Sequence, residues 1–258
     1  MTLEREIKVE GKVFKITISD DCTVLHSAYA EGRAVIGLWD RQKADGCLAP
    51  ARYVVEKAED ADDEFLERVV RRMEGLPLHI AGTERILIRE LVPEDCSFMP
   101  KEDDGGENNG LFSEREALKD YIRCQYGFYE YGIWALVDRN TKRLVGKAGL
   151  RNLELFGPDE FLEAIKNNDT PVELGYHIFS AFRQQGYGKE ACRAILHYGA
   201  EAVADRIYAR IREDNLPSVK LAESLGFRLI ARADSGSDSR MCLYGWNCSG
   251  RQESAHPW

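Results

Sequence analysis

The sequence lacks the features of a secreted or membrane-anchored protein. Its 258 residues include no apolar run close to the ~20 residues that span a membrane, and the charged start MTLEREIKVEGKVFKI has no signal-peptide core. Its seven scattered cysteines form no CxxC pair, which is typical of reduced thiols in a cytosol. We therefore expect a cytoplasmic protein with no membrane partner.

The sequence also lacks an excess of basic residues. It has 35 lysines and arginines against 44 aspartates and glutamates, a formal net charge of −9. Proteins that bind the nucleic-acid backbone usually present a basic surface, so we expect no nucleic-acid partner. The five histidines show no ligand spacing, and we expect no metal site. The composition is that of a globular protein, long enough for one large or two modest domains.

Residues 1–80 have the pattern of a small α/β domain. Its expected elements are strands at Glu6–Val9 and Val13–Ile18 that form a hairpin around Gly11, a helix at Asp20–Glu31, short strands at Ala34–Trp39 and Arg52–Glu56, and a helix at Asp62–Met73. Gly75, Pro77 and Gly82 then interrupt the pattern, which places a linker at residues 75–82. No motif in this domain names a ligand.

Residues 81–248 form the second predicted domain, and residues 249–258 a tail without an interpretable pattern. The expected elements are a strand at 83–91, an acidic loop at 101–110, a helix at Ser113–Tyr126, strands at Ile133–Val137, Leu144–Leu150 and Val172–Phe179, a helix at Gly188–Val203, a strand at Ile207–Arg212, a helix at Asn215–Leu225, and a hairpin of Leu229–Ala231 with Met241–Trp246. Glu116 follows Ser113 by three residues, which is the pattern of a capping box. The domain is expected to be a mixed sheet with helices on its faces.

The most informative segment joins the strand Val172–Phe179 to the next helix. Its sequence is Arg183-Gln184-Gln185-Gly186-Tyr187-Gly188-Lys189. The glycines permit positive φ and a close backbone approach to a ligand, and Arg183 and Lys189 add positive charge. Because unpaired amides at a helix start favour a phosphate, these residues predict a phosphate-binding strand–loop–helix. The loop matches neither GxxxxGK[ST] nor GxGxxG, and an ordinary tight turn is the alternative.

Three motifs in chain order resemble the GCN5-related N-acetyltransferase (GNAT) superfamily. Residues 183–188 resemble its R/Q-x-x-G-x-G/A loop, and Asn215-Leu216-Pro217-Ser218 with Leu225-Gly226-Phe227 resembles its N-x-x-S…LGF element. TERILIREL-VPED at 83–95 is similar to the opening strand of the ribosomal-protein alanine acetyltransferase-like branch. The resemblance covers about residues 83–246 and implies an α/β GNAT fold with a mixed, mostly antiparallel central sheet flanked by helices.

That resemblance implies a site for acetyl-coenzyme A as co-substrate. Residues implied to contact the pyrophosphate through backbone amides are Gln184, Gln185, Gly186, Tyr187, Gly188 and Lys189, with Arg183 nearby. Ile178 and Phe179 are implied to offer main-chain hydrogen bonds to the pantetheine arm between two splayed strands. Asn215 is implied to bind near the pantetheine or the thiol.

The resemblance also suggests two catalytic residues. Glu173 lies on the strand that carries the family's usual carboxylate and is the candidate base for the acceptor amine; a strand-end glutamate paired with a neighbouring cation is the alternative. Many relatives place a tyrosine acid where this sequence has Ala222, so Ser218 is the candidate acid for the departing thiolate. Ser218 as a mere helix cap, and a thiolate that leaves without an acid, are the alternatives.

The expected function is acetyl transfer from acetyl-coenzyme A to a primary amine by direct attack in a ternary complex. The acceptor stays open between a protein or peptide N-terminus, a polyamine, an amino acid and an amino sugar, with a slight preference for the N-terminus. The alternative is a weakly active or inactive coenzyme A-binding sensor whose residues 1–80 engage a partner. A third hypothesis lets residues 1–80 hold the acceptor. The oligomeric state is open, a homodimer included.

Overall fold

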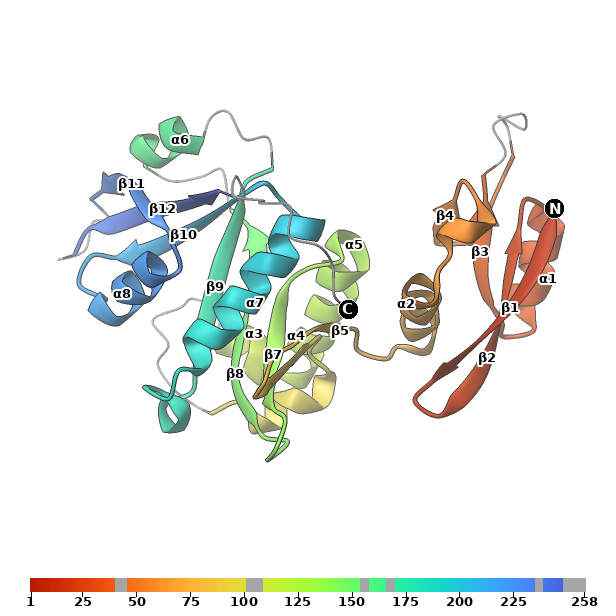
Figure 1. The fold of residues 1–258 in the computed structure, drawn as a ribbon, viewed down its shortest axis with the longest axis horizontal. Helices are drawn as coiled ribbons and strands as arrows, with labels where there is room; N and C mark the ends of the chain where they lie inside the picture. Colours follow the sequence, from red (N-terminus) through yellow and green to blue (C-terminus); the bar gives the residue numbers. More distant parts are fainter. Residues whose placement is uncertain (40–45, 101–108, 154–157, 166–169, 235–238, 248–258) are drawn as a thin grey trace. The chain divides into compact units, whose positions relative to one another are not determined.

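The computed structural model describes residues 1–39, 46–100, 109–153, 158–165, 170–234 and 239–247. The chain divides into two compact units, Met1–Leu78 and His79–Trp258, each with its own core (Figure 1). The sequence pattern puts the division after residue 80 and a linker at 75–82, but His79–Gly82 is already a strand of the second unit. Its Ile80 and Ala81 pack against the second core, which explains the earlier boundary. The predicted tail 249–258 and most of the acidic loop lie outside the described residues.

The first unit is a four-stranded sheet with one helix on each face. Its elements are β1 (Thr2–Val9), β2 (Lys12–Ser19), α1 (Cys22–Ala30), β3 (Ala34–Leu38), β4 (Tyr53–Val55) and α2 (Asp63–Glu74). β1 and β2 pair antiparallel, whereas β2, β3 and β4 run parallel in that order. Val35 of β3 packs with α1 and its neighbour Ile36 packs with α2, as the alternation of side chains along a strand requires.

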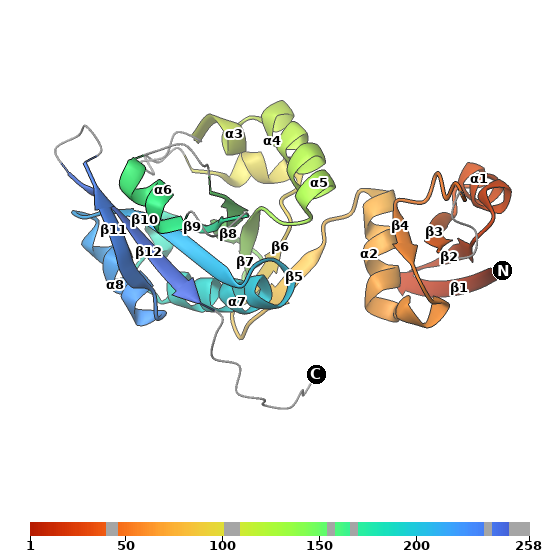
Figure 2. The same ribbon diagram turned by 90° about the horizontal axis from the view of Figure 1, so that it is seen from above.

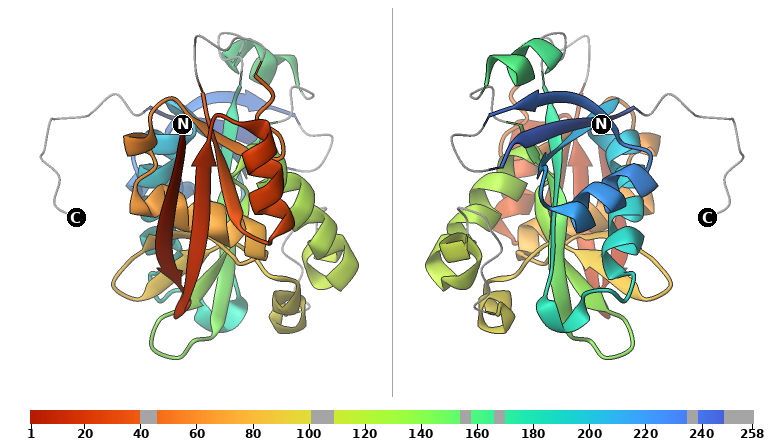
Figure 3. Two further views of the ribbon diagram at one scale, coloured as in Figure 1. Left: turned by 90° about the vertical axis from the view of Figure 1, so that its right-hand side faces the viewer. Right: turned by 90° about the vertical axis from the view of Figure 1, so that its left-hand side faces the viewer.

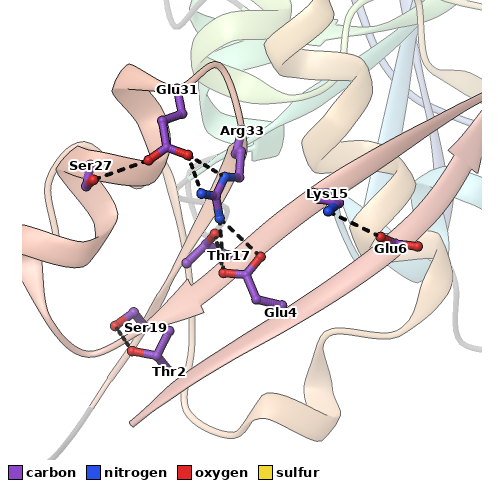
Figure 4. A network of polar contacts seen from close by, with 9 residues as sticks. All are labelled: Thr2, Glu4, Glu6, Lys15, Thr17, Ser19, Ser27, Glu31 and Arg33. Carbon is purple, nitrogen blue, oxygen red and sulfur yellow. Dashed lines mark hydrogen bonds and ion pairs between the residues drawn. The ribbon is translucent and has the colours of Figure 1, made fainter.

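The hairpin of β1 and β2 matches the prediction from its sequence. Its turn residues Glu10 and Gly11 both have positive φ, +46° and +82°, which is the geometry of a two-residue turn that suits the strand twist. Figure 4 shows the polar contacts on this hairpin: Thr17 donates to Glu4 at 2.8 Å, and Arg33 reaches Glu4 from the segment before β3. The contact of the buried Thr17 and that of the partly exposed Arg33 tie the edge strand β1 to the rest of the sheet.

The second unit is built on an eight-stranded sheet in the order β11-β12-β10-β9-β8-β7-β6-β5. Its strands are β5 (His79–Gly82), β6 (Ile86–Arg89), β7 (Ile133–Asp138), β8 (Leu144–Asn152), β9 (Val172–Ile178), β10 (Arg206–Arg212), β11 (Arg228–Ala233) and β12 (Met241–Asn247). All neighbours pair antiparallel except β9 and β10, which are parallel. The strands predicted from residue 133 onwards all form close to their expected bounds.

Helices cover both faces of this sheet. They are α3 (Asn109–Ser113), α4 (Arg115–Tyr121), α5 (Gly127–Tyr129), α6 (Asp159–Ile165), α7 (Tyr187–Ala202) and α8 (Leu216–Ser224). Figures 2 and 3 show α7 and α8 on one face and α3 to α5 on the other, and Figure 2 shows α6 on the side of α3 to α5. The α7 face holds the main core, which includes the fully buried Ile86 and Ile88 of β6. Leu87 packs on the opposite face, as the strand pattern predicts.

The single helix predicted at Ser113–Tyr126 is wrong in its details. Ser113 ends α3 instead of capping a helix, and the N-cap position of α4 belongs to Glu114, which makes no side-chain cap. α4 continues into a π-helical turn, Ile122–Tyr126, before α5. The buried side chains Phe112 and Leu118 pack into one cluster, and this tertiary burial outweighs the local capping pattern.

Candidate active site

The strands β9 and β10 begin as neighbours and then separate. Only Val172 with Ile207 and Glu173 with Tyr208 pair, at the amino ends of both strands. Beyond Glu173, β9 continues along β8 and β10 continues along β12. In the described chain no strand therefore pairs with the inner edges of β9 and β10 towards their carboxyl ends, although both lie in the middle of the sheet.

The pairing of β9 with β8 determines which main-chain groups face this divergence. The Phe179 N–H donates to the Val145 carbonyl at 3.0 Å, so Phe179 turns its main chain towards β8. Because antiparallel pairing alternates along a strand, the N–H groups of Tyr176 and Ile178 point the other way, towards β10. These two residues expose donors that a ligand between the strands can meet.

Ile178 and Phe179, both predicted to bind pantetheine through their main chains, differ in the direction of their N–H groups. Ile178 keeps its N–H towards the divergence, while its carbonyl accepts a 2.9 Å hydrogen bond from Arg183 Nε. The Phe179 prediction is wrong for the amide, because that N–H is bonded to Val145 and the Phe179 carbonyl accepts from the Phe182 N–H at 2.8 Å. Tyr176, two residues before Ile178, also points its N–H away from β8.

The loop that follows β9 ends at an uncapped helix start. Gly186 is the N-cap residue of α7 and has φ +86°, a conformation that side chains other than glycine rarely adopt. The first intrahelical bond runs from the Glu190 N–H to the Gly186 carbonyl, and no described side chain caps the helix. The amides of residues 187–189 therefore remain available, and the helix dipole favours an anion there. The exposed Lys189 lies in this first turn.

Arg85, just before β6, contacts both this loop and the first turn of α7. Its Nη1 donates to the Gln185 carbonyl at 2.9 Å and its Nε donates to Glu190 at 2.7 Å. Its guanidinium lies 4.6 Å from the centre of the Tyr187 ring. Burial by itself raises the pKa of Glu190, but hydrogen bonds from Thr83 and Arg85 outweigh that effect, and the pKa is lowered. The loop is therefore held by a charged network whose donors, Thr83 and Arg85, lie between β5 and β6.

The Tyr187 side chain anchors the loop to the sheet. Tyr187 is buried, and its hydroxyl donates to Asp138 at the end of β7 at 2.7 Å. This hydrogen bond, together with those from Thr141, lowers the pKa of Asp138 to about 2. The prediction for Tyr187 concerned its backbone amide, which stays at the helix start, so the side chain adds a structural role that the motif did not reveal.

Asn215 and Ser218 lie at the start of α8. Asn215 is the N-cap residue, and its Oδ1 accepts the Ser218 N–H at 3.3 Å. Ser218 Oγ accepts a 2.9 Å hydrogen bond from the Tyr176 hydroxyl of β9. Burial raises the pKa of Tyr176 to about 12, which the bond to Ser218 partly offsets. Tyr176 therefore stays protonated and leaves the Ser218 proton for another acceptor.

Glu173 lies where β9 and β10 separate, and its carboxylate is surrounded by donors. Arg210 Nη2 donates at 2.9 Å and Arg151 Nε at 3.1 Å, while the Arg210 N–H and Nε reach Oε1 at 3.2 Å. The Glu173 side chain is only 3% exposed. A carboxylate offers about four lone-pair positions, so these donors leave little room for the proton that a base must take. The alternative stated for Glu173, pairing with a neighbouring cation, describes this geometry.

A sequence model of the acetyltransferase (GNAT) domain matches residues 85–228, more than half of the chain. The chain belongs to the GNAT acetyltransferase family. This confirms the family and the type of enzyme that the loop and N-x-x-S motifs indicated. The matched segment begins at the bracing Arg85 and includes Glu173, the 183–189 loop and Ser218.

The chain is 27% identical over 123 residues to YjdG, an uncharacterized N-acetyltransferase of Bacillus subtilis; the match covers 47% of this chain and 66% of YjdG, just under two thirds. It is similar in structure to a GnaT-family acetyltransferase from Bordetella pertussis, with a TM-score of 0.53, 23% identity, and coverage of 65% of this chain and 99% of that one. It is also similar in structure to a ribosomal-protein-S5-alanine acetyltransferase from Vibrio fischeri, with a TM-score of 0.50 and 16% identity. That match covers 66% of this chain and 97% of the other. These structural likenesses confirm the GNAT fold.

Sequence reasoning about this GNAT domain missed three residues of the site. Tyr176 and Arg210 lie in predicted strands, where alternation shows the face of a side chain but not its partner on another element. Arg85 belongs to the quoted TERILIREL motif, yet its contact with Gln185 spans 100 residues. The only sequence signal for Arg85 was its position as a charged residue beside an apolar strand. That position is also typical of a side chain that is merely solvated.

The first unit has a cavity of its own, of about 400 Å³, lined by Met1, Thr2, Asp20, Asp21, Cys22, Gly46 and Cys47. None of the predicted site residues belongs to it. Within the described ranges, no group of three or more histidine, cysteine or acidic side chains is placed to hold a metal ion. The same residues include no helix with the length and apolar character needed to cross a membrane.

Proposed function

We propose that the GNAT domain transfers the acetyl group of acetyl-coenzyme A to a primary amine, by direct attack in a ternary complex. The observation that carries this proposal is the combination of an uncapped helix start at Gly186 with the divergence of β9 and β10, which offers the main-chain donors of Tyr176 and Ile178. The first feature suits a pyrophosphate and the second suits an amide-bearing chain such as pantetheine.

The residues at the loop and at α8 fit this co-substrate. The amides of Gly186 to Lys189 and the cations Arg183 and Lys189 hold the pyrophosphate, with Gln184 and Gln185 at the exposed rim of the loop. The Ile178 N–H and its neighbour on the same edge, the Tyr176 N–H, bind the pantetheine amides. Asn215 Nδ2 forms no hydrogen bond within the described chain and offers a further donor.

In the reaction, the nitrogen lone pair of the neutral amine attacks the thioester carbon, the C–S bond breaks, and the amine loses one proton while the thiolate gains one. We propose that the Ser218 hydroxyl donates to the departing thiolate and that the Tyr176 hydroxyl supports it by donating to Ser218 Oγ. The amine proton leaves to water beside the half-buried Gly175 and His177 of β9, and water returns a proton to Ser218, so that the serine is restored and one proton has moved from the amine to the thiolate.

Glu173 has a positioning role in this proposal. It joins β9 to β10 through Arg210 and to β8 through Arg151, at the point where the strands separate. If it were the base, Glu173→Gln would remove the dependence of the rate on a single ionisation and lower kcat by about a hundredfold or more. As a positioning residue, it changes kcat less and leaves the shape of the pH profile as it is in the wild type. The pH profile of kcat separates these outcomes.

The proposed function is tested by calorimetric titration with acetyl-coenzyme A, followed by a thiol-release assay over a panel of amines. We expect binding and amine-dependent release of coenzyme A thiol. Binding without release from any amine would favour the alternative of a coenzyme A-binding sensor. Absence of binding would contradict the assignment of the 183–189 loop and with it the proposed function.

A further inference from the structure

A pair of arginines lies on the face of the sheet opposite α7. Arg151 of β8 and Arg210 of β10 both contact Glu173 of β9. Lys147 and Arg151 lie four residues apart on β8 and therefore on the same face of the sheet. Lys147 Nζ is 4.3 Å from the centre of the Phe112 ring of α3, so this face is the one that α3 covers. Two guanidinium groups thus share one carboxylate on the side of the sheet that α3 belongs to.

If acetyl-coenzyme A binds between β9 and β10 as proposed, the face opposite α7 is the side of β9 left for the acceptor. On the opposite face Ile178 and, partly, Tyr176 pack in the core beneath α7, which closes that side of β9. On the α3 face the corresponding β9 residue is Gly175, which has no side chain; a Cβ there would be in ordinary contact with Ile133 Cδ1, at 3.6 Å. Glu173, which pairs with Arg151 and Arg210, lies two residues before Gly175 on β9 and on the same face of the sheet.

The Arg151 side chain is the more exposed of the two guanidinium groups that pair with Glu173. One carboxylate, 3% exposed, faces Arg210, whose side chain is 26% exposed, and Arg151, whose side chain is 44% exposed. Arg151 uses only its Nε, and within the described residues its Nη1 and Nη2 form no hydrogen bond. The group therefore presents the half-exposed guanidinium edge of Arg151 beside the proposed reaction site.

We infer, on the basis of the proposed acetyl transfer, that Arg151 binds a carboxylate of the acceptor, so that the acceptor is an amine carrying its own carboxylate, as in a free amino acid. A guanidinium edge with two open N–H donors matches a carboxylate in a planar, paired arrangement. A polyamine would bring further positive charge against Arg151 and Arg210, which disfavours it. This selects among the acceptors that the motifs left open.

The inference is tested with matched amines that differ only in the carboxylate. Phenylalanine is compared with phenethylamine, lysine with cadaverine, and spermidine serves as the polyamine, in the thiol-release assay with saturating acetyl-coenzyme A. We expect kcat/KM to be about ten- to a hundredfold higher for the carboxylate member of each pair. Arg151→Gln should abolish most of this ratio through KM, and Arg151→Lys, which keeps the charge but not the paired donors, should retain part of it.

A matched control is Arg232→Gln, which removes a half-exposed arginine that pairs with Glu213 away from this group. It should leave the ratio unchanged. Acetyl-coenzyme A affinity by calorimetry should stay within about twofold in all variants, since Arg151 is not assigned to the cofactor. Equal rates for both members of each pair in the wild type would overturn the inference while leaving the transferase intact.

A second measurement tests whether Arg151 recognises a carboxylate, and it requires no turnover. N-acetylphenylalanine and N-acetylphenethylamine are titrated into the protein saturated with coenzyme A. We expect the first to bind about tenfold more tightly or better, and Arg151→Gln to remove the difference. Equal affinities would overturn the inference. Failure of the proposed function has a different signature, which is no acetyl-coenzyme A binding or no thiol release from any amine.

Discussion

The hydroxyl of Tyr176 donates a 2.9 Å hydrogen bond to Ser218, 42 residues away in the chain. In this arrangement Ser218 accepts one hydrogen bond and keeps its own proton for a third group. The family resemblance suggests a tyrosine acid at the position of Ala222, and we propose that Ser218, supported by Tyr176 of β9, takes this role instead. The bond joins β9 to the start of α8, on the two sides of the divergence where we propose that pantetheine lies.

Removal of the Ser218 hydroxyl tests its assignment as acid. Ser218→Ala should lower kcat about a hundredfold, while Tyr176→Phe, which removes only the supporting donor, should lower it about three- to tenfold. Steady-state kinetics at several acetyl-coenzyme A concentrations checks both. Ser224→Ala, on the exposed end of the same helix, serves as the control and should behave as the wild type. Unchanged kcat in Ser218→Ala would mean that the thiolate leaves without an acid.

Gly186 is the residue of the loop that tolerates substitution least. Gly186→Asp combines a strained φ of +86° with a negative charge at the proposed pyrophosphate site, so acetyl-coenzyme A affinity should fall by about a hundredfold or more. Gly32→Asp is the matched control, because Gly32 has φ +78° and open space around it, but lies in the first unit. Acetyl-coenzyme A affinity is measured by calorimetry for both variants, and Gly32→Asp should bind as the wild type does. Equal affinity in Gly186→Asp and the wild type would rule out the loop as the pyrophosphate site.

Arg85 should act on affinity and not on chemistry. Arg85→Ala removes the donor to the Gln185 carbonyl and the partner of Glu190, so the loop loses its brace. We expect the KM for acetyl-coenzyme A to rise about tenfold with kcat within about twofold, and Arg85→Lys to recover only part of the loss because the forked donors are missing. Arg123→Ala, an exposed arginine paired with Asp120, is the control. A fall in kcat without a change in KM would contradict the bracing role.

The bond from Tyr187 to Asp138 should appear in the acid stability of the protein. The pKa of Asp138 is depressed from its ordinary value near 3.8 to about 2, so the stabilisation from its ionised form is present above about pH 4 and is lost as the pH falls towards 2. Tyr187→Phe should therefore melt at a lower temperature than the wild type at pH 6, with the difference narrowing between pH 4 and 2. Thermal melts across this range check the sign. A difference that is independent of pH would attribute the effect to packing alone.

The boundary at Leu78 predicts a self-sufficient fragment. Residues 79–258 should fold and bind acetyl-coenzyme A with an affinity within about twofold of the whole chain. A fragment that starts at residue 83 lacks β5, and with it the packing of Ile80 and Ala81 on the main core, so it should melt at a lower temperature. Insolubility of the 79–258 fragment would show that the two units share a core.

Local pattern was sufficient for most of the secondary structure. The β1–β2 hairpin, β7, β8, α7 and the β11–β12 hairpin all follow from apolar alternation or helical spacing with punctuating glycines, because burial on one face requires that periodicity. The pattern failed at Ser113, where a capping sequence lies inside a run of short helices. There the burial of Phe112 and Leu118 decides the chain path, and their cluster includes Leu91 and Ala135, which lie on other segments of the chain.

The sequence by itself determined the fold family and the uncapped helix start at Gly186, because a glycine-rich helix start depends on only a few consecutive residues. The tertiary structure alone decided the roles of individual side chains. Glu173 meets two arginines from neighbouring strands, and Ser218 receives a hydrogen bond from Tyr176. Such contacts join residues tens of positions apart, and their partners are selected by strand register and helix packing, which no local pattern encodes.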